Sequence, residues 1–375
     1  MEKGVGMRGD EERQEGFIML SSGEDMVPLD HPLRKIRRMV DVALAEMGPL
    51  FDSLYAEGGR TSIPPEYLLR AQVVKVLYAI PSERKLCEHV AYNLLFRWFV
   101  GLPFSETMWD HSTFTKNRDR LLSPAVTEAF FAQIRTQAEA RKVLSREHFS
   151  VDGTLIEAAA SLKSFRPREE AGGADGPDGS ARSGGRNPTV DFHGEKRSNK
   201  THCSRTDPDA RLARKGKGKE AKLAYAGHIL VENRNGLIVD VEVTQATGTA
   251  EREAALLLLG RERLRQKKRM TVGADRGYDT RDFVKETRLL KVTPHVARKK
   301  KGSAIDGRTT TWEGYGVSQR RRKVVEEPFG WLKTVGGFGK LLVRGLRKVR
   351  GGFAFAAAVF NLVRLKNLEA EPAPS

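Results

Sequence analysis

Cysteine is scarce in this chain of 375 residues, which contains only Cys87 and Cys203. A disulfide scaffold is therefore excluded, and no Cys-x-x-Cys or Cys-x-x-x-x-Cys pair is available to bind a metal. This low cysteine content predicts that the protein resides in a reducing compartment. Long apolar runs are also lacking, because the longest, Phe353–Val363, has 11 residues and includes Asn361. A membrane-spanning helix needs about 20 residues, so the sequence predicts no membrane partner.

The two ends of the chain are poor in features that build a core. Residues 1–20 carry charges throughout and contain no apolar segment of signal-peptide length, so we expect a cytoplasmic protein. Residues 1–30 hold eight acidic and three basic side chains, a net charge of −5. This composition is typical of disorder. We predict a disordered acidic leader over 1–30 and a disordered tail over 369–375.

Basic residues outnumber acidic ones in the rest of the chain. The whole sequence has 65 Lys and Arg against 48 Asp and Glu, a net charge of +17, which favours a polyanionic partner. Much of this excess lies between residues 295 and 366, where 17 basic residues face four acidic ones, a net charge of +13. A solvated basic face would explain such a run, but four embedded acids indicate something more specific.

A helical region is predicted over residues 31–145. Apolar side chains between Pro64 and Leu122 recur at steps of three and four, as on core-facing helices. Asp110 or Ser112 can then cap a short helix whose exposed positions include Lys116 and Arg118. Apolar helices followed by a short basic one fit a helix-turn-helix module that binds DNA through these cations. The alternative is a small helical bundle without a DNA role, to which such a pattern also belongs.

The pattern changes to alternating strands and helices from about residue 146. Residues 148–156 are rich in β-formers, and Asn233–Gly236 separates two further β-rich runs as in a hairpin. Helices over 249–265, 282–290 and 319–335 alternate with strands over 270–275 and 292–296. This order predicts an α/β domain with a mixed sheet flanked by helices. Because 12 of residues 171–187 are Gly, Ala, Ser or Pro, we predict a flexible, Gly-rich basic insertion over about 162–222.

Three acids stand out by their positions in this pattern. Asp152 lies within a β-rich run, Asp275 ends a buried strand, and Glu326 lies on a basic helical segment. Ligands of α/β sheets bind at strand ends. Carboxylates brought together would repel unless a cation joined them, and hard oxygen ligands select Mg²⁺ or Mn²⁺. Two such ions would suit phosphoryl transfer, while the surrounding cations would bind DNA.

At these residues the chain resembles the DDE transposases of bacterial insertion sequences, particularly those of the insertion sequence five group. The matching text extends from about Pro64 to Leu368 and includes five segments, at residues 149–161, 191–202, 273–280, 292–296 and 318–333. The family's third motif places Tyr, Arg, Glu and Lys at fixed spacing. It falls on Gln319, Arg322, Glu326 and Lys333, so glutamine occupies the tyrosine position.

The resemblance implies a ribonuclease H-like catalytic domain over residues 146–368. It makes Asp152, Asp275 and Glu326 the catalytic and metal-binding acids, with two Mg²⁺ ions that Mn²⁺ can replace. Glu326 is preferred to Glu327 by the motif spacing. Pro328 is expected to kink or restart the helix after these acids. The candidate DNA-binding cations are Arg320, Arg321, Arg322, Lys323, Lys333, Lys340, Lys116 and Arg118.

The implied activity is that of a transposase, which binds the terminal repeats of its element, cuts DNA and joins the freed 3′-OH to target DNA. Its partners would be double-stranded DNA and at least one further copy of the chain, because two ends must be held together. A nucleoid association would follow. A metal-dependent nuclease without strand transfer, or a non-catalytic DNA-binding protein derived from a transposase, are the alternatives. A zinc site at His193, His202 and Cys203 is disfavoured, because no second cysteine lies nearby.

Overall fold

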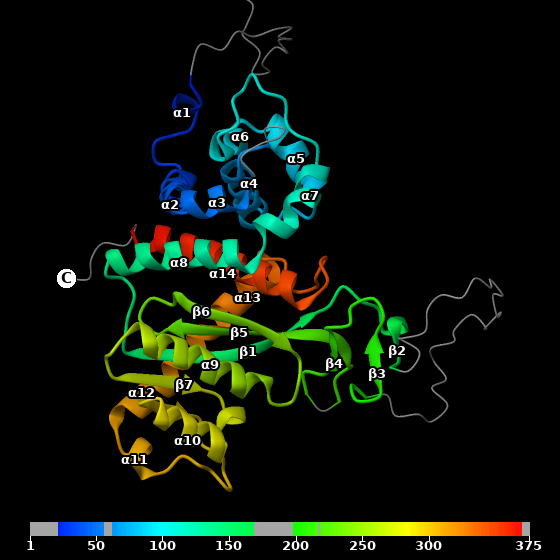
Figure 1. Ribbon diagram of the computed structural model, residues 1–375. Coiled ribbons are helices and arrows are strands. Elements are labelled where there is room, and N and C mark those ends of the chain that lie inside the picture. The colour runs from blue at the N-terminus through cyan, green and yellow to red at the C-terminus, as the bar shows by residue number, and fades with distance from the viewer. Residues whose placement is uncertain (1–21, 56–61, 169–197, 217, 370–375) are drawn as a thin grey trace, which may run out of the picture.

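Helices form the N-terminal part of the chain, and a helix-covered sheet forms the rest (Figure 1). The computed structural model describes residues 22–55, 62–168, 198–216 and 218–369. The N-terminal helices are α1 (Gly23–Met26), α2 (Pro32–Glu46), α3 (Gly48–Leu54), α4 (Pro65–Leu77), α5 (Glu83–Tyr92), α6 (Leu94–Val100), α7 (Ser112–Leu121) and α8 (Pro124–Ala140). The helical interpretation of this region is thus confirmed.

Local signals in the sequence set the bounds of these helices. The side chains of Ser82, Asn93 and Ser123 accept hydrogen bonds from backbone N–H groups in the first turns of α5, α6 and α8. Helix α6 ends at Gly101, whose φ of +88° is accessible to glycine at little cost. The predicted cap of the short basic helix is also present, because the Asp110 carboxylate accepts a hydrogen bond from the Ser112 backbone N–H at 2.8 Å.

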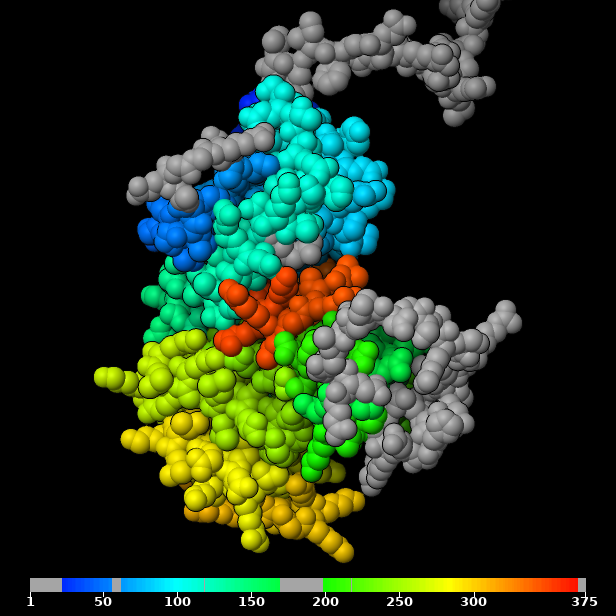
Figure 2. All heavy atoms as spheres, turned by 45° about the vertical axis from the view of Figure 1, so that its right-hand side comes forward, coloured from blue at the N-terminus to red at the C-terminus, as the bar shows by residue number. Residues whose placement is uncertain are grey.

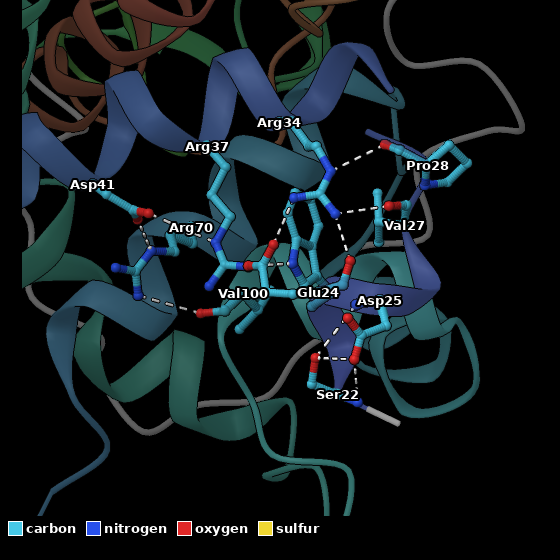
Figure 3. A network of polar contacts seen from close by, with 11 residues as sticks. Ser22, Glu24, Asp25, Val27, Pro28, Arg34, Arg37, Asp41, Arg70 and Val100 are labelled. Carbon is cyan, nitrogen blue, oxygen red and sulfur yellow. Dashed lines mark hydrogen bonds and ion pairs between the residues drawn. The ribbon is translucent and has the colours of Figure 1, made fainter. Parts of the chain in front are cut away.

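The expectation of a disordered leader was wrong for residues 22–30. Here α1 is held by Glu24, whose carboxylate accepts hydrogen bonds from Arg34 at 2.6 Å and from the Trp98 indole at 2.8 Å (Figure 3). Arg37 pairs with the same carboxylate at 3.3 Å and lies over the Trp98 ring, 4.5 Å from its centroid. The acidic leader therefore finds basic partners in α2. Residues 1–21 lie outside the described part of the chain.

The sheet combines antiparallel and parallel strands. Its strands are β1 (His148–Glu157), β4 (Arg211–Ala213), β5 (Lys222–Glu232), β6 (Ile238–Gln245), β7 (Met270–Ala274) and β8 (Val292–Val296), in the order β4-β5-β1-β7-β8 with β6 also paired to β5. Strands β5 and β6 form the predicted hairpin, with φ of +72° at Gly236 in the turn. β1, β7 and β8 are parallel. The mixed sheet expected of a ribonuclease H-like domain is therefore present.

Helices cover both faces of this sheet. Helix α9 (Ala250–Arg265) packs on the face where Gly153 and His228 lie, because a Cβ on Gly153 would be 3.0 Å from Glu251 Cγ. The opposite face meets η4 (Arg322–Val325) at Gly273 and α14 (Leu346–Leu368) at Gly227. Helices α10 (Arg281–Leu289), α11 (Gly307–Thr310), α12 (Glu313–Arg321) and α13 (Glu326–Thr334) complete the domain.

The expectation of a flexible insertion over 162–222 was wrong for its flanks. Residues 162–168 contain η1 (Leu162–Ser164) and β2 (Phe165–Pro167), and β2 pairs with β3 (His202–Ser204) in a separate two-stranded sheet. Strand β4 then joins the main sheet beside β5. The Gly-rich residues 169–197, which include His193, lie outside the described part of the chain. His202 stacks on Phe165 at 5.4 Å between ring centroids, which gives it a packing role.

The last helix joins the two parts of the molecule. α14 lies side by side with α8, between the N-terminal helices and the sheet (Figure 1). Its buried Asn361 accepts a hydrogen bond from the Ile238 backbone N–H at 2.9 Å and donates one to the Ile238 carbonyl at 2.7 Å. Phe130 of α8 stacks on Phe355 of α14 at 5.3 Å. The apolar core thus runs without a break from one part to the other.

Within the described residues, no helix has the length and apolar character needed to cross a membrane.

Candidate active site

The sheet brings Asp152 and Asp275 to the same level on neighbouring strands. β1 and β7 are parallel, and their register pairs Ser150 with Gly273. Two residues further along each chain lie Asp152, within β1, and Asp275, just after β7 ends at Ala274. Because side chains alternate along a strand, Asp152 shares the face of Ser150, and that face meets η4. The first two of the three acids predicted from the sequence are therefore at the same level on neighbouring strands.

Backbone groups hold both carboxylates. The Asp152 carboxylate accepts a hydrogen bond from the Gly153 N–H at 2.8 Å. The Asp275 carboxylate accepts one from the Gly277 N–H at 2.7 Å and so caps the short helix η3 (Arg276–Tyr278). Asp275 is exposed and Asp152 is half-buried, so the pair opens to solvent. A bulky substrate such as a DNA strand can reach it.

The electrostatics of the site disfavour negative charge at Asp152. The pKa of this carboxyl is raised to about 6, chiefly by burial and also by the charges of Asp275 and Glu251, against the opposing effects of the Gly153 hydrogen bond and the Arg322 guanidinium. Within the described chain, neither aspartate has an ion-pair partner within 4.0 Å. Two neighbouring carboxylates without an ion-pair partner are a donor set that a divalent cation stabilises.

The structure does not bring Glu326 into this pair. The helical segment predicted over 319–335 is divided into α12, the 3₁₀ turn η4 and α13, which begins at Glu326. The break expected around Pro328 is therefore present, two residues earlier than the proline. A 3₁₀ turn rotates each residue by about 120°, so Arg322 and Glu326 do not share the face expected of a continuous helix. Glu326 is exposed, and Glu327 pairs with Arg364 at 3.6 Å.

The remaining positions of the third motif contact the sheet. Gln319, at the tyrosine position of the family motif, donates a hydrogen bond from its side chain to the His295 carbonyl of β8 at 2.6 Å. The His295 ring is bonded to the Ser318 hydroxyl at 2.6 Å. Tyr315, four residues earlier, donates to the Val296 carbonyl at 3.0 Å. These contacts dock α12 on β8 and so position Arg322 beside Asp152.

Sequence reasoning missed two residues next to the acidic pair. Glu251, in the first turn of α9, has a pKa raised by burial and by the charge of Asp275. Tyr278 is 1% exposed, and its hydroxyl has no hydrogen-bond partner among the residues that the structure describes. Nothing in the sequence separates Glu251 from Glu253 in the same turn, because acids are common at helix N-termini. Only the fold reveals the difference.

The predicted DNA-binding cations lie at several distances from the acids. Arg320, Arg321 and Lys323 are exposed. Arg322 is half-buried, and within the described ranges its Nε atom has no hydrogen-bond partner. Burial and the nearby charge of Lys215 lower the pKa of Lys333, which indicates a local excess of positive charge. Lys116 is exposed on α7. The side chain of Arg118, on the same helix, lies outside what the structure describes.

An open edge of β1 separates the acids from part of this basic surface. In the described chain β1 pairs with β7 only up to Ser150, and on the same side its far end, Glu157, forms a bridge with Lys340. The C-terminal segment that carries Lys333 and Lys340 is exposed between the N-terminal helices and the sheet, where it is coloured orange-red (Figure 2). Lys340 thus lies at one end of this edge, and Asp152 lies near the other.

A metal ion would need more ligands than this pair. Among the residues that the structure describes, no group of three or more His, Cys, Asp or Glu side chains is arranged to hold one. The roles of Asp152, Asp275 and Glu326 as catalytic and metal-binding residues remain predictions. For Asp152 and Asp275 the structure supports these roles, because it places the two acids at one level of the sheet.

The raised pKa of Asp152 predicts a pH-dependent gain in stability when this acid is removed. The folded protein binds the proton more tightly than the unfolded chain, so the carboxyl costs stability as pH rises from 3.8 to about 6. In EDTA, Asp152→Asn should therefore be more stable than wild type above pH 6, by about 1 kcal/mol after allowance for solvent screening. Urea denaturation at pH 4 and pH 7 measures this. An equal difference at both pH values would contradict it.

Comparisons with known proteins are consistent with this geometry. A family model described as Transposase domain (DUF772) matches residues 21–120, and a second, described as Transposase DDE domain, matches residues 144–362. No curated protein matches the chain at a significant level. The second match covers more than half of the chain and includes Asp152, Asp275 and Glu326.

Solved structures of transposases are among those similar to this one. A piggyBac transposase synaptic complex with hairpin DNA shares 10% identity over 92% of this chain and 77% of that chain, with a TM-score of 0.43. A Mos1 mariner paired-end complex with Mn shares 10% identity over 92% of this chain and 98% of that chain, with a TM-score of 0.21. A Mos1 mariner paired-end complex with Mg shares 11% identity over 80% of this chain and 88% of that chain, with a TM-score of 0.19.

The N-terminal match, the long C-terminal match and the convergence of the first two acids agree with one another. The chain belongs to the Transposase DDE domain family and is a DNA transposase.

Proposed function

We propose that this transposase belongs to the insertion sequence five group, binds the terminal repeats of its element, cuts DNA at their ends and joins the freed 3′-OH to target DNA. The observation that carries the proposal is the placement of Asp152 and Asp275 at one level of the sheet, in a chain of the DDE family. Asp275 is exposed, Asp152 is half-buried, and the Arg322 guanidinium acts on Asp152. This arrangement suits a phosphodiester substrate.

The residues at the site fit a divalent cation. Asp152 and Asp275 have no cationic partner within ion-pair distance in the described chain, and their charges repel. They would hold Mg²⁺ or Mn²⁺, with Glu326 as the further acid that the family motif implies. When bound, a pair of such ions would activate the attacking oxygen and neutralise the phosphate oxygens. The backbone N–H groups of Gly153 and Gly277 keep the two carboxylates oriented.

The basic residues would position DNA around this pair. Arg322 lies close enough to Asp152 to act on its pKa, so a phosphate bound there would lie beside the acids. Lys333 and Lys340 would contact the backbone along the open edge of β1, and Lys116 and Arg118 of α7 would contact the terminal repeat. Such binding would weaken steeply with salt, and would associate the protein with the nucleoid. Two ends held together would require at least two copies of the chain.

A strand-transfer assay tests this function. The purified full-length chain is mixed with DNA that carries the sequences flanking its own gene, with pre-cleaved copies of these ends, and with a target plasmid and Mg²⁺. Joined products are the expected result. Cleavage without joining would instead establish a nuclease on this scaffold. The absence of both products, with Mn²⁺ as well as with Mg²⁺, would indicate a DNA-binding protein without catalytic activity.

A further inference from the structure

A run of four cations follows the strand next to Asp275. Residues 298–301 read Arg-Lys-Lys-Lys and come shortly after β8, which ends at Val296. β7 and β8 are parallel, and their register pairs Ala274 with Val296. The pairing extends beyond the strands, because the Ala297 N–H donates a hydrogen bond to the Ala274 carbonyl at 3.0 Å. Asp275 and the four cations therefore leave neighbouring strands at the same edge of the sheet.

One buried carboxylate fixes the loop that carries these cations, residues 298–304, which we call the basic loop. Asp279 follows Asp275 by four residues and is 1% exposed. Its two oxygens accept hydrogen bonds from both ends of the basic loop, from the Lys299 N–H at 2.7 Å and from the Ala304 N–H at 2.8 Å. The Lys299 ammonium group also donates a hydrogen bond to the Asp279 carbonyl. The basic loop is thus tied to the segment that begins at Asp275.

The other three cations of the basic loop face solvent. Arg298, Lys300 and Lys301 are exposed, and within the described chain none of them forms an ion pair. The acid that follows them along the chain, Asp306, is already paired with two arginines. No atom lies within 4 Å of the position that a Cβ at Gly302 would take, so the tip of the loop is open. Three neighbouring positive charges without a counter-charge attract a polyanion.

The strand order sets where such a polyanion would lie. β7 lies between β1 and β8 in the sheet. Asp152 of β1 and the basic loop after β8 are therefore on opposite sides of Asp275. A DNA strand bound at the two aspartates would continue onto the basic loop.

We propose that the basic loop binds phosphodiester groups of the DNA at the Asp152–Asp275 pair, through Arg298, Lys300 and Lys301, and that Asp279 is the residue that positions it. The inference rests on the proposed function, which places DNA at the two aspartates. The cations proposed above to bind DNA belong to α7 and to the segment from α12 onwards. The basic loop adds a contact on the β8 side of the acids, and Asp279 lies outside the motif of three catalytic acids.

Binding of the full-length chain to duplex DNA tests the inference without any measurement of activity. Fluorescence anisotropy is measured in EDTA over a series of salt concentrations. One labelled duplex carries an end of the element, taken from the sequences flanking its gene, and a second duplex of equal length is unrelated. The triple variant Arg298→Gln/Lys300→Gln/Lys301→Gln should lower the slope of log affinity against log salt by about 3, roughly one unit per lost phosphate contact. Its affinity should fall about tenfold or more.

The chain offers a matched control at the other end of β7. Lys267, Lys268 and Arg269 are three consecutive exposed cations directly before this strand begins at Met270. Lys267→Gln/Lys268→Gln/Arg269→Gln removes the same charge from the edge of the sheet opposite to Asp275. It should keep the salt dependence of wild type. Circular dichroism verifies that both triple variants are folded.

Asp279→Asn separates the positioning of the basic loop from the effect of charge. Asparagine has a single acceptor oxygen, so one of the two backbone hydrogen bonds is lost while a negative charge is removed. If Asp279 acted by its charge alone, the variant would bind DNA more tightly than wild type. We expect weaker binding. Added to the triple variant of the basic loop, Asp279→Asn should cause no further loss, whereas a general structural effect would add to the first.

The outcomes distinguish the inference from the function on which it rests. A loss of affinity for both duplexes, or for one of them, supports the inference and identifies the DNA that the loop contacts as any duplex, the element end or the target. If the two triple variants bind alike, the basic loop is refuted as a DNA contact, and strand transfer by wild type is unaffected by that result. Tighter binding by Asp279→Asn would refute the positioning role. If wild type binds neither duplex, the proposed function fails and the inference fails with it.

Discussion

Replacing Asp275 with asparagine is expected to reduce metal-dependent DNA cleavage about a thousandfold, because a lost ligand removes several kcal/mol of charge stabilisation. The change should leave the fold intact. The asparagine side-chain oxygen can still accept the hydrogen bond from the Gly277 N–H, which is 2.7 Å long in the wild type. Cleavage of labelled terminal-repeat DNA in Mg²⁺, measured as an initial rate, gives the effect.

DNA binding should survive the same substitution. Asp275 is exposed and negatively charged, so its removal reduces repulsion of phosphate and leaves the cations in place. A mobility-shift assay should therefore show binding equal to or tighter than wild type. Asp282→Asn, on an exposed carboxylate in the first turn of α10, is the control and should cleave normally. An Asp275→Asn protein that cleaves DNA at the wild-type rate would disprove the assignment of this acid.

Replacing Arg135 with methionine is expected to destabilise the folded chain by about 3 kcal/mol, because it leaves a buried acid without its main partner. Arg135 of α8 is 8% exposed and Glu262 of α9 is 1% exposed, and they form an ion pair at 2.8 Å. Arg135 also donates a hydrogen bond to the Val239 carbonyl of β6 at 3.0 Å. The free energy of unfolding, from urea denaturation, measures the loss.

A nearby exposed arginine gives the matched control. Arg146 pairs with Glu139 at 3.8 Å with half of its side chain exposed. Arg146→Met should therefore change the free energy of unfolding by less than about 1 kcal/mol. Combining Arg135→Met with Glu262→Leu should recover part of the loss, because the second change removes the unpaired charge. If the two arginine variants are equally stable, the buried pair does not join α8 to the sheet as described.

Much of the catalytic domain could be predicted because its signals are local. The strand at 292–296 has the predicted bounds, and α9 begins within one residue of its predicted start. The Asn-Gly turn specifies its hairpin without help from distant residues. The ordering of residues 22–30 could not be predicted in this way. It depends on the contact between Glu24 and Trp98, which are 74 residues apart. The net charge of a segment does not reveal which distant residues its side chains contact.

In the candidate site, too, some features could be predicted from the sequence and others could not. The association of Asp152 with Asp275 follows from the family motif, which is visible in the sequence, while the adjacency of their strands comes from the fold. The 3₁₀ turn at Arg322–Val325 was not predicted, because helical periodicity assumes a uniform rotation, although Pro328 indicated a break nearby. Glu251 could not be singled out. Its distinction from Glu253 depends on the missing side chain at Gly153, on a strand 98 residues earlier.

The position of α14 has a consequence for the order in which the protein matures. This helix is synthesised after α8 and β6, yet both pack against it. While the ribosome still holds residues 346–368, the apolar sides of α8 and β6 remain uncovered, and the earlier part of the chain cannot close its core. Closure of the core must therefore wait until α14 has left the ribosome, and a product truncated before Leu346 would expose a surface that chaperones and proteases recognise.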